Sequence, residues 1–163
     1  MPHFLRFQSF LVATPPPAAQ KINTYQFTDG LKLGSAVKLP LLGLFASTDI
    51  PYEIDRRGLS EIYPSLDEMA QVALKALEAA TQNQDKGFFL MIEGSRIDHA
   101  GHANDPAAQV HEVLAYDKAF STVVDFLDKS ADDGMLIATS DHETGGLAVA
   151  RREFDLASLV SHC

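Results

Sequence analysis

Two short apolar runs in the second half of the chain, each followed by charged residues, restrict most strongly the folds open to this sequence. The run Gly87–Ile92 (GFFLMI) is too short for an independent helix and leads directly into Glu93. The run Gly134–Thr139 (GMLIAT) leads in the same way into Asp141 and His142. Continuous apolar runs of this length are typical of strands that are buried on both faces of a parallel sheet.

A helical pattern separates these two runs. Asp105 and Pro106 are suited to the N-cap and the first position of a helix, which we expect to continue to about Lys129. Its apolar residues form one stripe: Val110, Val113, Leu114, Phe120, Val124 and Leu127. A strand, a helix and a second strand predict a right-handed crossover between parallel strands. Both charged clusters then lie at the carboxyl edge of the sheet, where open α/β sheets bind ligands.

The first half of the chain adds a strand and a packing helix. The run Leu39–Ala46 (LPLLGLFA) predicts a third strand buried on both faces. Ser65 and Glu68 form a capping box, and apolar residues follow at helical spacing: Met69, Val72, Ala73, Ala76, Leu77 and Ala80. Tyr52, Asp55 and Arg56 either line a site or form a surface network, and the network is the commoner case.

The charge of −9 on 163 residues is unevenly distributed. Residues 1–60 contain six Lys and Arg against four Asp and Glu, whereas residues 61–163 contain seven against eighteen. An acidic second half that carries most of the histidines suits cation binding and argues against nucleic acid as a partner.

The compartment remains unknown from the sequence. Cys163 is the single cysteine, so no intrachain disulfide is expected. The apolar residues of Met1–Val12 are interrupted by polar ones and make a poor signal peptide. No apolar run is long enough for a transmembrane segment. We therefore predict neither an export signal nor a membrane span.

The segment Glu93–His102 (EGSRIDHAGH) concentrates potential metal ligands. Asp98 and His102 are four positions apart and share one face if the segment is helical. Carboxylate and imidazole together suit zinc, whereas carboxylates with hydroxyl groups suit magnesium. The adjacent Asp141 and His142 can also reach one side of a turn. We predict a metal site where the two clusters meet, although an Asp next to a His can also simply orient its ring.

These motifs resemble those of the alkaline phosphatases. Glu93–His102 is similar to the segment that supplies a magnesium ligand and two zinc ligands in that family, and Thr139–Gly146 to the segment that supplies two ligands of the second zinc. Further similarity lies upstream, in Leu42–Ala46, Tyr52–Arg56 and Pro64–Met69. The resemblance implies a three-layer α/β sandwich with a mostly parallel sheet flanked by helices, which is incomplete in this chain.

The resemblance also divides the chain into three parts. Residues 39–150 correspond to a partial alkaline phosphatase-like domain. Residues 1–38 form an unmatched, irregular N-terminal segment, and residues 151–163 form an unmatched tail.

Ligand roles follow from the same resemblance, residue by residue. Glu93 would bind Mg²⁺, Asp98 and His102 the first Zn²⁺, and Asp141 and His142 the second Zn²⁺. His99 stands where the family has a His or Lys that acts on phosphate through water or a neighbouring ligand. The implied activity is zinc- and magnesium-dependent hydrolysis of phosphate monoesters through a phosphoserine intermediate, in a protein that is usually a homodimer.

The nucleophilic serine of the family has no counterpart in this sequence. Ser35 lacks the expected aspartate before it, and Ser95 and Ser140 lie within the metal motifs. We therefore predict that this chain alone is incomplete and inactive. Two alternatives stay open: a truncated, catalytically inactive fragment that binds metal or a partner, and a related metal-dependent phosphoglycerate mutase or sulfatase.

Overall fold

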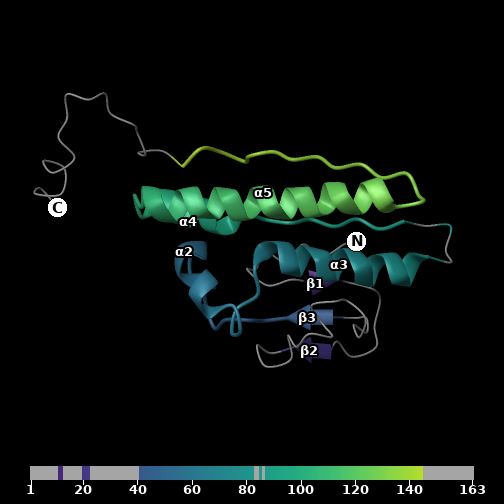
Figure 1. Cartoon of the computed structure of the whole chain (residues 1–163), viewed down its shortest axis with the longest axis horizontal. Coiled ribbons are helices and arrows are strands. Elements are labelled where there is room, and N and C mark those ends of the chain that lie inside the picture. Colours follow the sequence, from purple (N-terminus) through teal and green to yellow (C-terminus); the bar gives the residue numbers. More distant parts are fainter. Residues whose placement is uncertain (1–10, 13–19, 23–40, 83–84, 86, 145–163) are drawn as a thin grey trace, which may run out of the picture.

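The computed structural model describes residues 11–12, 20–22, 41–82, 85 and 87–144. Its elements follow in the order β1 (Leu11–Val12), β2 (Gln20–Ile22), β3 (Leu41–Gly43), α2 (Glu53–Arg56), the short 3-10 helix η2 (Arg57–Leu59), α3 (Leu66–Thr81), α4 (Ser95–His102) and α5 (Pro106–Lys129). The long helix α5 lies beside α3 and contacts α4 and α2, and the strands lie on the other side of α3 (Figure 1).

The three short strands form one sheet with β3 at its centre. β1 pairs antiparallel to β3, with Leu11 opposite Leu42, and β2 pairs parallel to it, with Gln20 opposite Leu41. The sheet places β3 against α3, because Leu41 of the strand and Val72 of the helix belong to one buried cluster.

The prediction that Leu39–Ala46 is buried on both faces was wrong. Leu41 and Phe45 are buried, but Leu44 between them is 45% exposed, so burial alternates along the chain. This is the pattern of a strand with one covered face, since successive side chains point to opposite sides. Residues 39 and 40 lie outside the described part of the chain.

The prediction of a capped packing helix is confirmed in α3. The backbone N–H of Glu68 donates to Ser65 Oγ at 3.4 Å, and the Ser65 N–H donates to Glu68 Oε2 at 2.9 Å. Both bonds satisfy N–H groups that have no partner within the helix. The buried residues of α3 are Ala70, Val72, Ala73, Leu74, Ala76 and Leu77, a wider face than the sequence indicated.

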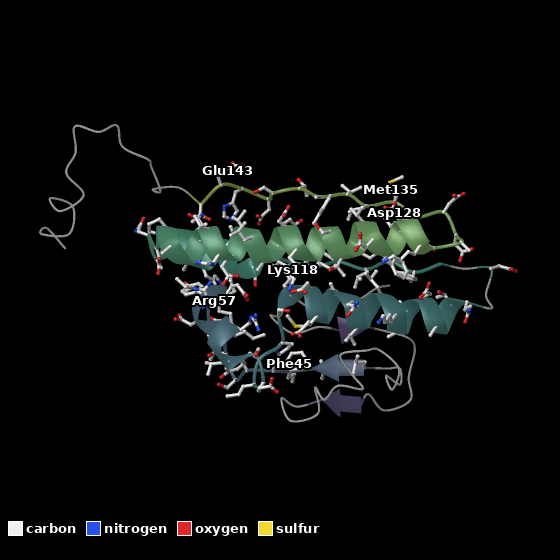
Figure 2. All side chains as sticks on the ribbon, in the orientation of Figure 1. Phe45, Arg57, Lys118, Asp128, Met135 and Glu143 are labelled. Carbon is white, nitrogen blue, oxygen red and sulfur yellow. The ribbon has the colours of Figure 1, made fainter. Side chains whose placement is uncertain are left out.

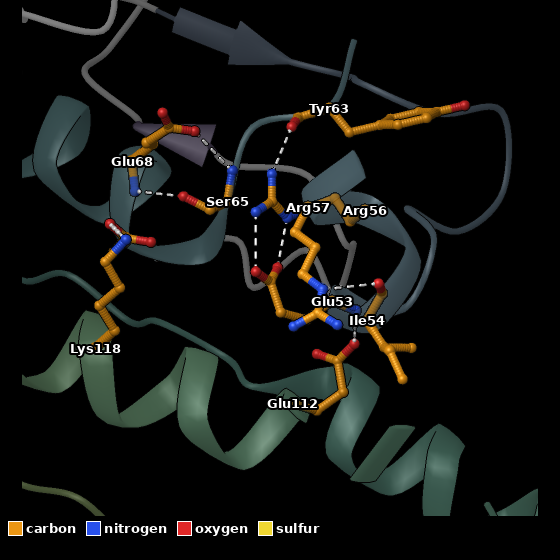
Figure 3. Close-up of polar contacts among 10 residues, drawn as sticks. Glu53, Ile54, Arg56, Arg57, Tyr63, Ser65, Glu68, Glu112 and Lys118 are labelled. Carbon is orange, nitrogen blue, oxygen red and sulfur yellow. Dashed lines mark hydrogen bonds and ion pairs between the residues drawn. The ribbon is translucent and has the colours of Figure 1, made fainter. Parts of the chain in front are cut away.

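An ion pair between Glu53 and the buried Arg56 lies in the segment between β3 and α3 (Figure 3). Arg56 donates through Nε to Glu53 Oε2 at 2.5 Å and through Nη2 to Glu53 Oε1 at 2.9 Å. Its Nη1 donates to the carbonyl of Tyr63 at 3.0 Å. Arg56 is only 8% exposed. It therefore forms a network of polar contacts within the protein and does not line an open site.

The helix α5 begins and ends where the sequence predicted. Asp105 caps it by accepting a hydrogen bond from the Ala108 N–H at 2.9 Å, and Pro106 occupies the first turn. Its predicted apolar stripe, however, is largely exposed: Val110 is 59% exposed and Leu114 is 58% exposed. The residues of α5 that are buried are Ala108, Ala119 and Val123.

The two predicted central strands do not pair in the described part of the chain. Gly87–Ile92 and Gly134–Thr139 are extended, run in the same direction, and flank α5 on opposite sides (Figure 1). Phe89 is 82% exposed and Met135 is 83% exposed. A strand forms only with a neighbour that accepts its backbone hydrogen bonds, and the described residues supply none to these two segments.

The three-layer sandwich is therefore not formed among the described residues. They show helices packed on one face of a short mixed sheet. The predicted βαβ unit keeps its order, its helix and the common direction of its extended segments, but no sheet joins these two segments within the part of the chain that the structure describes. Residues 145–150 of the predicted domain and the whole of its predicted tail lie outside the described part, as does most of the predicted N-terminal segment.

Candidate metal and phosphate site

The helix α4 brings Asp98 and His102 onto one face, as their spacing predicted. His102 Nε2 lies 3.4 Å from Asp98 Oδ2. The helix begins after Gly94, directly beyond the extended segment that ends at Glu93. A side chain at Gly94 is excluded, because a Cβ there would lie 2.8 Å from the ring of Tyr116. This close approach fixes where the segment turns into the helix.

The second cluster reaches the same carboxylate from 44 positions further along the sequence, and Asp98 is where the two clusters meet. His142 Nε2 lies 3.7 Å from Asp98 Oδ1 and 3.8 Å from Asp141 Oδ2. Thr144 Oγ1 donates a hydrogen bond to Asp98 Oδ1 at 2.5 Å.

The turn that carries Asp141 and His142 is held by its own backbone contacts. Ser140 Oγ donates to the carbonyl of His142 at 2.7 Å, and the His142 N–H donates to Asp141 Oδ1 at 3.1 Å. Its approach to α4 depends on Gly101, since a Cβ there would lie 2.9 Å from the Cβ of Thr144. The segment that carries Met135 and Glu143 runs along α5 in Figure 2, and its Thr144 is bonded to Asp98 of α4.

The electrostatics of the site favour an ionised Asp98. The hydroxyl of Thr144 lowers the pKa of Asp98 most strongly, and His102, His142 and His99 lower it further, whereas desolvation opposes them. Asp98 is partly exposed, with 37% of its side chain accessible, and His102 is 69% exposed. A carboxylate that stays charged, flanked by two accessible imidazoles, is a suitable place for a cation.

Glu93 stands apart from these residues. It is exposed, directly before Gly94, and within the described residues it joins neither Asp98 nor the histidines by a hydrogen bond or an ion pair. Among the described residues, no three Asp, Glu, His or Cys side chains are arranged as a complete metal-binding group. The arrangement therefore consists of ligand pairs that share Asp98.

The distance within the first pair is that expected between zinc ligands. Zinc binds nitrogen and oxygen at about 2.0–2.1 Å with tetrahedral geometry, which sets neighbouring ligand atoms about 3.3 Å apart. The 3.4 Å separation of Asp98 and His102 is close to this value, whereas the 3.8 Å separation of Asp141 and His142 is larger. The donor chemistry of both pairs and the separation within the first fit zinc.

His99 belongs to a second set of contacts, which link α4 to the segment before α2. Its Nδ1 lies 2.9 Å from Arg96 Nη1, and the same Nη1 lies 3.2 Å from Asp49 Oδ2. The guanidinium carbon of Arg96 lies 3.9 Å from the ring centroid of Tyr52.

Three residues of these networks were missed from the sequence: Asp49, Arg96 and Thr144. Arg96 and Thr144 lie inside the recognised motifs, but their partners are distant in the sequence, 47 and 46 positions away. Tyr52, for which a site and a surface network were both left open with the network as the commoner case, contacts Arg96.

Comparison with known proteins assigns the family. A sequence model of the family described as Alkaline phosphatase matches residues 27–161. The chain belongs to the alkaline phosphatase family. The matched range includes residues 39–150, over which the motifs were recognised, and extends beyond them on both sides.

Curated alkaline phosphatases give the same result. The chain is 60% identical to the repressible alkaline phosphatase of Saccharomyces cerevisiae over 122 residues, which are 73% of this chain and 21% of that protein. It is 51% identical to the alkaline phosphatase of Schizosaccharomyces pombe over 126 residues, 77% of this chain and 23% of that protein. For alkaline phosphatase 3 of Bacillus subtilis, the identity is 42% over 110 residues, 67% and 22% of the two chains.

The chain spans between 21% and 23% of the length of these three relatives. It thus corresponds to one part of an alkaline phosphatase. Within the described part, no helix has both the length and the apolar character required to cross a membrane.

Proposed function

We propose that this chain forms the metal-binding part of a phosphomonoesterase of the alkaline phosphatase type. The observation that carries the proposal is the meeting of two sequence clusters at one carboxylate, with Asp98 within 3.4 Å of His102 and 3.7 Å of His142. Membership of the family and the names of the relatives support phosphate monoesters as the substrates.

The ligand assignment is part of the proposal. Asp98 and His102 would hold one zinc ion, Asp141 and His142 a second, and Glu93 a magnesium ion. Zinc at these positions would supply a Lewis acid that activates hydroxyl groups and stabilises charge on the transferring phosphoryl group.

The residues of this chain prepare that site in three ways. The Thr144 hydroxyl and the neighbouring histidines keep Asp98 ionised by lowering its pKa, so the carboxylate can bind a cation without first losing a proton. The same hydroxyl fixes one oxygen of Asp98 and leaves the other facing His102. The backbone contacts of the turn hold His142 beside them.

The substrate-binding step would use a hydrogen-bond donor next to the metal ligands. His99 follows Asp98 directly and lies on α4, so a phosphate bound beside Asp98 and His102 would lie near this helix. The nucleophilic serine is predicted to belong to a part of the protein outside this chain. Homodimer formation also stays a prediction.

Zinc titration of the chain tests the metal assignment. We expect the wild-type chain to bind zinc and both Asp98→Asn and His142→Ala to weaken that binding, by about tenfold or more. Asp125→Asn, which removes a carboxylate on the exposed surface of α5, is the matched control and is expected to bind zinc as the wild type does. A folded chain that binds no zinc would contradict the assignment.

Hydrolysis of an aryl phosphate tests the reaction. The chain is joined to the segments that its relatives carry outside the matched region, and turnover is measured with and without a chelator. We expect turnover that the chelator abolishes. Turnover that is insensitive to the chelator would exclude this mechanism.

A second candidate is a fragment that binds metal or a partner but has no activity. The exposed apolar residues of the two extended segments favour it, in particular Phe89, Met135 and Ile137, because surfaces of this kind are normally covered. A monodisperse, folded chain with zinc content near zero and no turnover would support this candidate over the first.

A further inference from the structure

The imidazole of His142 lies almost equally close to two carboxylates. Its Nε2 is 3.7 Å from Asp98 Oδ1 and 3.8 Å from Asp141 Oδ2. Asp98 also lies 3.4 Å from His102 Nε2 through its other oxygen, Oδ2. Distance alone therefore does not decide whether a metal ion at His142 is shared with Asp98 or with Asp141.

The hydroxyl of Thr144 makes the two oxygens of Asp98 unequal. Thr144 Oγ1 donates to Oδ1 at 2.5 Å, and Oδ1 is the oxygen that faces His142. Hydrogen bonds from a hydroxyl to an ionised carboxylate are about 2.5–2.7 Å long and roughly twice as strong as those between neutral groups. Each carboxylate oxygen has two lone pairs, and this bond uses one of the two on Oδ1. It therefore weakens Oδ1 as a metal ligand and fixes the rotation of the carboxylate, with Oδ2 towards His102.

The position of Thr144 is set by its packing on α4. A Cβ at Gly101 would lie 2.9 Å from the Cβ of Thr144 and 3.1 Å from its Cγ2, so the methyl group of the threonine lies over the glycine. The side chain of a β-branched residue has few allowed rotamers. Packing of the methyl group over Gly101 thus keeps the hydroxyl directed at Asp98.

We propose that Thr144 is a positioning residue that assigns Asp98 to the metal ion of His102 and leaves Asp141 as the carboxylate partner of His142. The inference rests on the proposed function, since it takes zinc as the ion that these pairs bind. Thr144 contacts neither the metal nor the substrate and acts only through Asp98. Without its hydroxyl, Oδ1 is free to serve His142, and one carboxylate is shared between the two sites.

This role differs in its consequences from simple support of the turn. If Thr144 only held the turn in place, its loss would weaken zinc binding at His142 and leave Asp141 as necessary as before. If Thr144 directs Asp98 away from His142, its loss supplies a second carboxylate there. Asp141 then becomes less necessary for zinc binding at His142.

A zinc titration of the chain, followed by nitrogen NMR of the imidazole rings, reports the two sites separately and needs no phosphatase activity. The signals of His102 and His142 are assigned by their loss in His102→Gln and His142→Gln. The sample is held about one unit above the ordinary histidine pKa of about 6.5, so that protons compete little with zinc.

The decisive quantity is the effect of Asp141→Asn on the zinc affinity at His142. With Thr144 present, we expect this change to weaken binding about tenfold. In Thr144→Val, which keeps the branched shape over Gly101, we expect the same change to weaken binding by less than about threefold, because coupled ligands do not contribute additively.

Two further variants serve as controls for this measurement. Thr144→Ser keeps a hydroxyl and is expected to restore the loss of about tenfold in Asp141→Asn. Thr122→Val removes a hydroxyl that donates to the carbonyl of Lys118 on α5, and it is expected to leave that loss unchanged.

An equal loss at His142 in the presence of Thr144 and in a folded Thr144→Val chain would overturn the proposal. Thr144→Ala also lacks the hydroxyl and gives the same test if Thr144→Val does not fold. Zinc binding at both rings with an unchanged loss in Asp141→Asn would contradict this inference alone. A folded wild-type chain that binds zinc at neither ring would contradict the proposed function as well.

Discussion

Two regions of this molecule differ in how their polar groups are used. In residues 41–82, one charged side chain is buried and paired: Arg56 is 8% exposed and is bonded to Glu53 and to the Tyr63 carbonyl. In residues 87–144, the charged side chains that meet at Asp98 are accessible, with His142 53% exposed. The first region pairs Arg56 within its own structure, whereas the second leaves the groups around Asp98 accessible to solvent.

The two long helices show the same difference in their apolar residues. α3 buries six residues, among them Val72 and Leu77, whereas α5 buries three small or medium ones and exposes Val110 and Leu114. A helix contributes to stability through the face that it buries, not through its length. The shorter helix is therefore expected to contribute more per residue to the stability of this chain.

The largest expected effect is that of Arg56→Met, which tests the difference between the two regions. Removing one partner of a buried ion pair leaves the Glu53 carboxylate and the Tyr63 carbonyl unpaired. We expect a loss of about 3 kcal/mol in the free energy of unfolding, measured by urea denaturation. The neighbouring Arg57→Met removes an exposed arginine and is expected to change it by less than about 0.5 kcal/mol. Equal losses in both variants would show that burial does not distinguish the two arginines.

A matched pair of leucine substitutions compares the two helices directly. Leu77→Ala in α3 removes a side chain that is 7% exposed and packs with Ala73 and Leu90, and we expect it to cost about 2–3 kcal/mol. Leu114→Ala in α5 removes one that is 58% exposed and should cost less than about 0.5 kcal/mol. Urea denaturation measures both values. A large loss in Leu114→Ala would mean that the face of α5 is covered in solution.

The helix caps should matter less than the core, and about equally in both regions. Ser65→Ala removes one bond of the capping box of α3, and Asp105→Ala removes the bond from the Ala108 N–H at the start of α5. Each is expected to cost about 1 kcal/mol in the free energy of unfolding. A much larger loss in Ser65→Ala than in Asp105→Ala would show that the cap of α3 is coupled to the buried core around it. The difference in stability between the two regions would then be greater than their buried residues alone indicate.

The smallest expected effect is a pH dependence at the contact between α5 and α2. Desolvation raises the pKa of Glu112, while the Glu53 N–H, which donates to it at 2.6 Å, and Arg96 oppose the rise. A carboxyl whose pKa is raised on folding binds protons more tightly in the folded state. Its contribution therefore favours folding below the ordinary glutamate pKa of about 4.3 and is lost as the pH rises through the folded pKa.

Glu112→Gln removes this titration while keeping an acceptor for the Glu53 N–H. We expect the variant to lose less stability than the wild type as the pH rises above the ordinary glutamate value, measured as unfolding free energy against pH. Glu143→Gln, an exposed change in the second region, should leave the wild-type pH profile unaltered. Parallel profiles for the wild type and Glu112→Gln would contradict the raised pKa.

Features set by neighbouring residues were predictable from the sequence. The caps at Ser65 and Asp105, the bounds of α5 and the shared face of Asp98 and His102 all depend on contacts within about one helical turn. The meeting of the two metal clusters was also expected, because their placement after successive apolar runs brings them to one end of the structure. The family was recognised from the same motifs and is confirmed by the comparisons.

Features that need distant partners were not predictable. Gly87–Ile92 and Gly134–Thr139 read as strands from their side chains, but a strand also needs a neighbour, and the described residues supply none. The one-sided burial of β3 depends on α3 covering a single face. The local apolar pattern predicts neither the missing strand pairing nor the one-sided burial of β3. It shows which side chains a segment can bury, but not which other elements pack against that segment.

The sequence by itself determined the residues proposed as ligands, their spacing and the family, because these follow from residue identity over short distances. Tertiary structure alone decided what holds the site. Thr144 reaches Asp98 from 46 positions away, and Asp49 reaches Arg96 from 47 positions away. The physical reason is that the hydrogen bonds that orient these side chains form between elements, and only the packing of α4 against its neighbours brings those groups within bonding distance.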